Sequence, residues 1–199
     1  YFKVISESVG IIKSTAWILW IFVFSAFFGA AYKMIYPLTQ IYMQNSNLDI
    51  AFFGIASAYF FLVAALASKL ANGFELLFKK WSFAVLSVFL IIPVFVISSF
   101  VFKAGFLIFG LIFFASSIAT IITNHEILKI TPESKHATVL SFGNLFYRGI
   151  FAVTSPIFGY YLGAFGFQTA LIYFGLILSV ISFTILIVHS RIVKDISVR

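Results

Sequence analysis

The stretch that decides the fold is residues 81–102, WSFAVLSVFLIIPVFVISSFVF, which contains no charged side chain. A helical crossing of the ~30 Å hydrocarbon layer of a bilayer takes ~20 apolar residues, so this stretch predicts a transmembrane helix. Pro93 lies inside it, and membrane helices tolerate such a proline because neighbouring groups satisfy the freed carbonyl. Five further apolar runs surround it and predict spans at 16–44, 50–70, 104–124, 137–162 and 167–188.

The composition also indicates that most of the chain is surrounded by lipid. Of its 199 residues 62% are hydrophobic and 10% are charged, which leaves too little polar surface to cover a soluble core. Six spans use most of this length, so we predict an all-α membrane protein whose residues 1–199 form one six-helix bundle in a bilayer. The chain begins with Tyr1 rather than Met, and we therefore expect a piece of a longer protein.

The basic residues between the runs predict the orientation. Short cytoplasmic loops of membrane proteins retain Lys and Arg, whereas loops on the other side carry few. On one side of the membrane, the segments between the spans contain Lys103 as their only basic residue. The other side, which holds the amino terminus, is therefore predicted to be cytoplasmic. Because the number of spans is even, both termini lie on that side. The net charge of +7 then needs no nucleic-acid partner. The predicted cytoplasmic side collects Lys3, Lys13, Lys69, Lys79, Lys80, Lys129, Lys135, Arg191, Lys194 and Arg199.

The first candidate site surrounds Lys33, a charge inside the first span. Such a charge costs ~3 kcal/mol at the bilayer centre, so it points to a function. Tyr36, Gln40 and Gln44 follow at steps of three and four, which places them on the same helical face. Two interpretations stay open: the face lines a water-filled cavity, or Lys33 extends its amine to the interface among belt aromatics.

The second candidate site surrounds Arg148 in the fifth span. Asn144 and Ser155 share its stripe of small and polar residues, which suits a substrate pathway or a packed interface. We expect Arg148 to be buried and partnered, with Glu126 or a helix carbonyl as the structural alternative to a pathway role. Thr120 and Asn124 share a face of the fourth span, although Thr often bonds its own backbone in such helices. Residues at the helix ends are candidates for gating: Glu126, Glu133, His136 and Ser141.

No pattern in the sequence indicates an enzyme. It has no HExxH, no GxSxG, no P-loop and no pair of acids within a span, and its three histidines lie at helix ends far apart. Cysteine is absent, so thiolate metal sites and cysteine nucleophiles are excluded. We therefore expect neither catalysis nor a metal or cofactor.

Two stretches carry a resemblance to a known family. Residues 132–159, PESKHATVLSFGNLFYRGIFAVTSPIFG, resemble a loop and the following helix late in major facilitator superfamily transporters. Residues 36–44, YPLTQIYMQ, together with 64–69, AALASK, resemble the seventh and eighth helices of drug-exporter-like bacterial members. The chain departs from the family pattern at His136, where many members carry Arg, and in the loop motif, which is degenerate at 71–75.

The resemblance implies the C-terminal half of such a transporter, built as two inverted three-helix repeats. It implies that the first, second, fourth and fifth helices face a central cavity and that the missing N-terminal half is a partner. The implied function is secondary active transport of a small, drug-like solute by alternating access, as in multidrug efflux, in a bacterial plasma membrane with protons as a candidate coupling ion. The alternative is a six-helix substrate-capture membrane subunit of a vitamin importer.

Overall fold

A computed structural model describes residues 16–197, and these form six α-helices joined by short turns of 3-10 helix. Lys3, Lys13 and Arg199, which entered the orientation prediction, lie outside the described residues, as does the side chain of Lys194. The helices are α2 (Ala16–Asn45), α3 (Phe53–Phe78), α4 (Ser82–Ser99), α5 (Phe109–Ile130), α6 (His136–Phe165) and α7 (Phe167–Ser197). The turns are η1 (Ile50–Phe52), η2 (Lys79–Trp81), η3 (Lys103–Ile108) and η4 (Glu133–Lys135).

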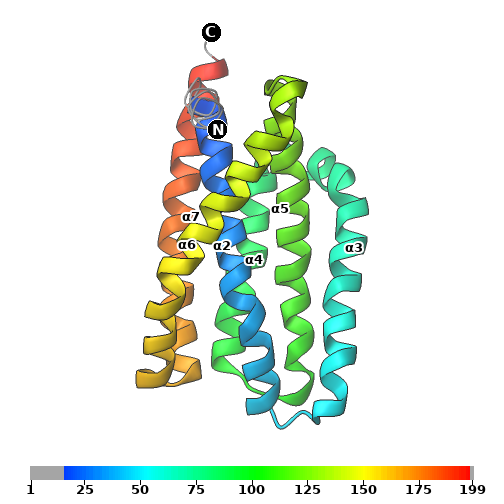
Figure 1. The fold of residues 1–199 in the computed structure, drawn as a ribbon, viewed down its shortest axis with the longest axis vertical. Coiled ribbons are helices and arrows are strands. Elements are labelled where there is room, and N and C mark those ends of the chain that lie inside the picture. Colours follow the sequence, from blue (N-terminus) through cyan, green and yellow to red (C-terminus); the bar gives the residue numbers. More distant parts are fainter. Residues whose placement is uncertain (1–15, 198–199) are drawn as a thin grey trace.

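Length and hydropathy mark this as a helical membrane protein. Within the described residues, four segments are long and apolar enough to cross a bilayer: Ala16–Asn45, Ile50–Ser99, Lys103–Ile130 and Phe167–Val193. The 50-residue segment contains both α3 and α4, which run in opposite directions (Figure 1). The helix outside the four segments is α6, whose 30 residues include Asn144, Arg148 and Pro156. That α6 also crosses stays a prediction.

Each predicted span falls on one helix, but three bounds differ by several residues. The span predicted at 104–124 corresponds to α5 at Phe109–Ile130, α7 continues past residue 188 to Ser197, and α3 also ends later than predicted. This helix was expected to end at residue 70 but continues to Phe78, because Ala71 and Phe74 extend the buried face begun by Ala67. It ends where Lys79 adopts a φ of 47°. Lys69, which was expected at the end of this span, is therefore an exposed residue more than two turns before the end of α3.

The helices form two layers (Figure 1). Four of them make a row in the order α6, α2, α5, α3, in which each helix packs against the next. Behind this row, α7 packs against α2 and α4, and α4 packs against α5. Contacts of α3 with α4 and of α6 with α7 close the two edges. We call the four-helix row the front layer.

Hydrogen bonds fix both ends of α2, the central helix. Near its start, Trp20 Nε1 donates to the Ile185 carbonyl of α7 at 2.7 Å. Near its end, the Tyr42 hydroxyl contacts the connection between α4 and α5. The first described residue, Ala16, and the end of α7 lie at the same end of the bundle, as an even number of helices requires (Figure 1).

Candidate functional site

The polar stripe predicted on α2 points away from the core. Tyr36, Gln40 and Gln44 are exposed and Lys33 is half-buried. The opposite face of the same helix segment is fully buried and includes Ile35, Leu38, Tyr42 and Met43. Pro37 lies inside α2, and the helix continues past it to Asn45. The stripe therefore occupies a surface of the front layer that none of the six described helices covers.

Aromatic rings from three helices gather beside the stripe. The ring centroid of Tyr36 lies 6.3 Å from that of Phe61 on α3 and 6.1 Å from that of Phe113 on α5. Tyr32 meets Phe113 edge-on at 5.2 Å. The sequence does not predict this cluster, because helical periodicity does not show which rings of different helices meet.

On α5, the two predicted residues differ in exposure. Thr120 is exposed and its hydroxyl donates to the Ser116 carbonyl one turn earlier at 2.8 Å. Asn124 is half-buried, and no described residue hydrogen-bonds its side chain. Thr120 thus has the self-bonded geometry that weakened its prediction as a pathway residue.

A serine pair joins α3 to α5 on the same layer. Ser117 donates to the Ala64 carbonyl at 2.8 Å, and its oxygen lies 2.8 Å from the Ser68 oxygen. The sequence could not predict this pair, because helical periodicity says nothing about the rotation of one helix against another.

Arg148 differs from its prediction. It is exposed, and no hydrogen bond or ion pair joins it to another described residue. Glu126, the alternative partner, instead forms an ion pair with Lys129 at 2.6 Å. Among the described residues, Arg148 therefore has neither the burial nor the partner that was expected. The reason is that α6 packs against α2 through Phe142 and Phe146, so its polar stripe is turned outward.

The other members of that stripe lie on the same helix. Asn144 and Ser141 are exposed, and Ser155 is half-buried. The structure does not bring Arg148 into contact with Asn124 or Glu126 of α5, because α2 lies between α5 and α6 in the front layer. The predicted site is therefore a broad surface rather than a compact pocket.

The gating candidates lie around the α5–α6 connection. His136 Nε2 donates to the Thr131 carbonyl at 2.7 Å, which ties the start of α6 to the end of α5. Glu133 is exposed in η4. Among the residues that the structure describes, no group of three His, Asp or Glu side chains could hold a metal ion.

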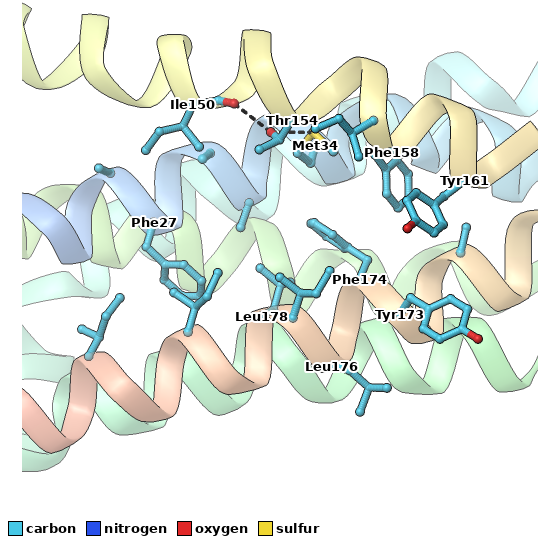
Figure 2. Close-up of a pocket in the computed structure, with 18 of the residues that line it drawn as sticks. Phe27, Met34, Ile150, Thr154, Phe158, Tyr161, Tyr173, Phe174, Leu176 and Leu178 are labelled. Carbon is cyan, nitrogen blue, oxygen red and sulfur yellow. Dashed lines mark hydrogen bonds between the residues drawn. The ribbon is translucent and has the colours of Figure 1, made fainter.

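A cavity of about 810 Å³, which the sequence did not predict, lies between α2, α6 and α7 (Figure 2). It is lined almost entirely by apolar side chains. No sequence pattern indicates this cavity; it forms because α6, with Val139 as its one buried residue, covers its neighbours loosely.

Comparisons with known proteins add no identification. No protein family, no curated protein and no solved structure matched this chain.

Proposed function

We propose that this chain is a six-helix half of a secondary transporter of the major facilitator type. The observation that carries the proposal is a symmetry in the helix packing. Exchanging α2 with α5, α3 with α6 and α4 with α7 turns each main helix contact into another one. The α3–α5 contact becomes α6–α2, α4–α5 becomes α7–α2, and α3–α4 becomes α6–α7, while α2–α5 and α4–α7 map onto themselves.

The direction of the helices supports an inverted relation between the two sets of three. α2 and α5 run in opposite directions, as do the other exchanged pairs (Figure 1). Inverted three-helix units of this kind are the building blocks of many secondary transporters, in which the substrate site lies where the repeats meet.

The front layer has the chemistry of a cavity wall. Its exposed surface carries Gln40, Thr120, Asn144 and Arg148 among apolar side chains such as Leu145. In contrast, α4 exposes Val88 and Ile92 between its ends, and α7 exposes mainly apolar side chains such as Val180 and Phe183. A polar surface at membrane depth is costly in lipid, and it is stable where it meets water or another polar surface. The front layer therefore faces a second bundle across an aqueous pathway for a small solute.

Within this pathway Arg148 supplies a planar, permanently charged group to an anionic part of the substrate or to the opposite bundle. In a bacterial plasma membrane the same arrangement would serve efflux or uptake, with protons as the coupling ion. Among the described residues, no Asp or Glu joins Gln40, Thr120, Asn144 and Arg148 on the exposed surface of this pathway. The carboxylate that couples proton movement to transport therefore belongs to the partner bundle.

The test uses single cysteines, since the natural chain has none. Gln40→Cys and Thr120→Cys lie on the front layer, and Val88→Cys and Val180→Cys are matched exposed positions on α4 and α7. In the native membrane, a membrane-impermeant maleimide should modify the first two and spare the second two, because only a hydrated thiol ionises and reacts.

Alternating access adds a second requirement. Gln40→Cys should react from both sides of the membrane, in intact cells and in inside-out vesicles. Front-layer thiols as unreactive as Val88→Cys would refute the cavity. Reaction from one side alone would favour a substrate-capture subunit over a transporter.

A further inference from the structure

The groove between α2, α6 and α7 has a small-residue floor and an open side. Its floor is α2, where Ala26, Ala30 and Ala31 leave space that larger side chains would fill. Figure 2 shows α6 and α7 as its two walls, with Phe27 toward one end and Tyr161 and Tyr173 toward the other. We call this hollow the α6–α7 groove.

The lining of the α6–α7 groove excludes water. Its one polar side chain away from the ends is Thr154, whose hydroxyl already donates to the Ile150 carbonyl at 2.8 Å and lies 3.8 Å from Met34 Sδ. A water molecule needs two to four polar partners to occupy a buried site, and away from the ends this lining offers at most the lone pairs of the Thr154 hydroxyl. The groove is therefore dry.

The open side of the groove exposes large apolar residues. Tyr173, Leu176 and Ile177 of α7 are each about half exposed. These belong to Phe167–Val193, a segment apolar enough to cross a bilayer, so the groove opens toward lipid. An unfilled hollow forfeits the dispersion contacts of its lining, and acyl chains are the only abundant apolar molecules at this place.

The length of the groove agrees with a single acyl chain. Along α7 its lining runs from Ala170 to Ile185, and the part between Tyr173, at the end with the tyrosines, and Ile185 measures ~18 Å at ~1.5 Å per residue. One leaflet of a ~30 Å hydrocarbon layer is ~15 Å deep. The groove thus spans one leaflet, the depth that a phospholipid tail itself occupies.

One end of the groove suits the ester region of a lipid. Phe165 stacks on Tyr161 with centroids 5.5 Å apart and meets Tyr173 edge-on at 6.3 Å. Neither tyrosine hydroxyl hydrogen-bonds another described residue. Tyrosines concentrate at membrane interfaces because the ring is apolar and the hydroxyl bonds polar groups there.

We propose that the α6–α7 groove is a lipid site that holds one acyl chain of a membrane phospholipid, with the ester carbonyls at Tyr161 and Tyr173 and the methyl end near Phe27 and Ile185. The lipid belongs to the leaflet on the side of the α6–α7 turn. This site is independent of the transport proposal, because it lies on the opposite flank of α6 from the exposed polar stripe.

The experiment uses the full chain in vesicles of phosphatidylethanolamine and phosphatidylglycerol that contain a photoreactive phosphatidylglycerol. Two probes carry the diazirine either at the methyl end or beside the ester of one acyl chain. After illumination, mass spectrometry of peptides should place the methyl-end probe near Phe27 and Ile185 and the ester-side probe near Tyr161 and Tyr173. Excess unlabelled lipid should compete with both.

Two variants make the site falsifiable. Ala30→Phe fills the floor and should lower groove labelling roughly tenfold, the effect of ~1.4 kcal/mol of lost binding. Ala152→Phe adds the same ring to an exposed position of α6 outside the groove and should leave labelling unchanged. Ile177→Trp, which blocks the open side, replaces Ala30→Phe if that variant does not fold.

Three results would overturn the proposal. Labelling spread evenly over all lipid-facing helices would show ordinary annular lipid. Labelling that both filling variants leave unchanged would place the acyl chain elsewhere. The reversed order of the two probes would contradict the assigned position of the ester.

Discussion

At the scale of single residues, the Tyr42 hydroxyl is the best-connected polar group of the core. Its oxygen lies 3.1 Å from the Phe100 carbonyl oxygen and 3.3 Å from that of Phe102, and it accepts from the Phe102 amide at 3.3 Å. The Tyr42 side chain is fully buried. Gly105 lies directly against this hydroxyl, where a Cβ atom would overlap the Tyr42 oxygen.

We predict that Tyr42→Phe lowers the free energy of unfolding by ~1–3 kcal/mol, because the Phe102 amide loses a buried partner. Gly105→Ala should also destabilise, by ~1–3 kcal/mol, since the added methyl group collides with a fixed hydroxyl. The double variant should lose less than the sum, because removing the hydroxyl relieves part of the collision.

Thermal unfolding in detergent measures all three variants. Tyr160→Phe, which removes an exposed hydroxyl on α6, is the control and should leave the melting temperature unchanged. Strict additivity in the double variant would contradict the close approach of Gly105 to Tyr42.

Among the candidate site residues, the sequence predicted which side chains share a helical face better than it predicted their burial or their partners. The α2 stripe is exposed because its periodicity is opposite to that of the buried residues, and periodicity can be read from sequence. The sequence could not predict whether Glu126 or Asn124 would lie near Arg148, since this depends on which helix lies beside α6. The order of the helices is a property of the tertiary fold, in which α2 rather than α5 lies beside α6.

At the scale of helices, α6 is held to α2 at a close crossing. Gly29 meets the ring of Tyr147, and a Cβ atom at Gly29 would lie 2.8 Å from Tyr147 Cγ. Elsewhere α6 is loosely packed, with Val139 as its one buried residue. The crossing at Gly29 is therefore a main attachment of α6 to the bundle.

We predict that Gly29→Ala loosens α6. Alanine favours a helix over glycine by ~1 kcal/mol, so a neutral site should gain stability from this change. At Gly29 overpacking of ~1–3 kcal/mol outweighs that gain. Hydrogen–deuterium exchange should therefore rise in α6 and stay constant in α4 and α5.

Gly54→Ala on α3 is the matched control, because nothing lies within 4 Å of a Cβ atom there. This control should keep the exchange of α6 unchanged. Equal behaviour of the two variants would mean that helix propensity, and not the crossing, governs position 29.

The helix boundaries themselves were largely predictable from hydropathy. Pro132 follows the end of α5 at Ile130, and each of the six apolar runs overlaps one of the six helices. The end of α3 was not predictable, because Gly73 and Asn72 suggested a loop where the helix continues. Buried contacts of Ala71 and Phe74 override the low helix propensity of glycine there.

At the scale of the whole molecule, the charges are distributed unequally between the two ends of the bundle. Lys79, Lys80 and Lys129 lie at the end that also holds Ala16 and the end of α7 (Figure 1). Lys103 begins η3 at the other end. The packing of the helices thus brings Lys79, Lys80 and Lys129 to one end of the bundle, as the sequence predicted. Which side of the membrane this end faces is set during insertion and not by the fold.

The final prediction concerns that side. Positive loops stay in the cytoplasm during insertion, since moving one charge against a membrane potential of ~100 mV costs ~2.3 kcal/mol. The lysine-rich end should therefore be cytoplasmic. An impermeant maleimide added to intact cells should label Ala51→Cys and Ala104→Cys, which are exposed at the lysine-poor end, and should not label Ser134→Cys or Ser190→Cys. Permeabilised cells, in which all four must react, provide the control.

A charge variant tests the cause of this orientation. Replacing Lys79, Lys80 and Lys129 by Gln removes three of the six described basic residues at one end, with Lys69, Lys135 and Arg191 remaining, while Lys103 stays at the other end. If these lysines set the orientation, part of the population should then insert the other way, and Ser134→Cys should begin to react in intact cells. Labelling of Ser134→Cys in intact cells, in the chain that keeps all its lysines, would contradict the predicted orientation. An unchanged pattern in the charge variant would assign the orientation to residues other than these three.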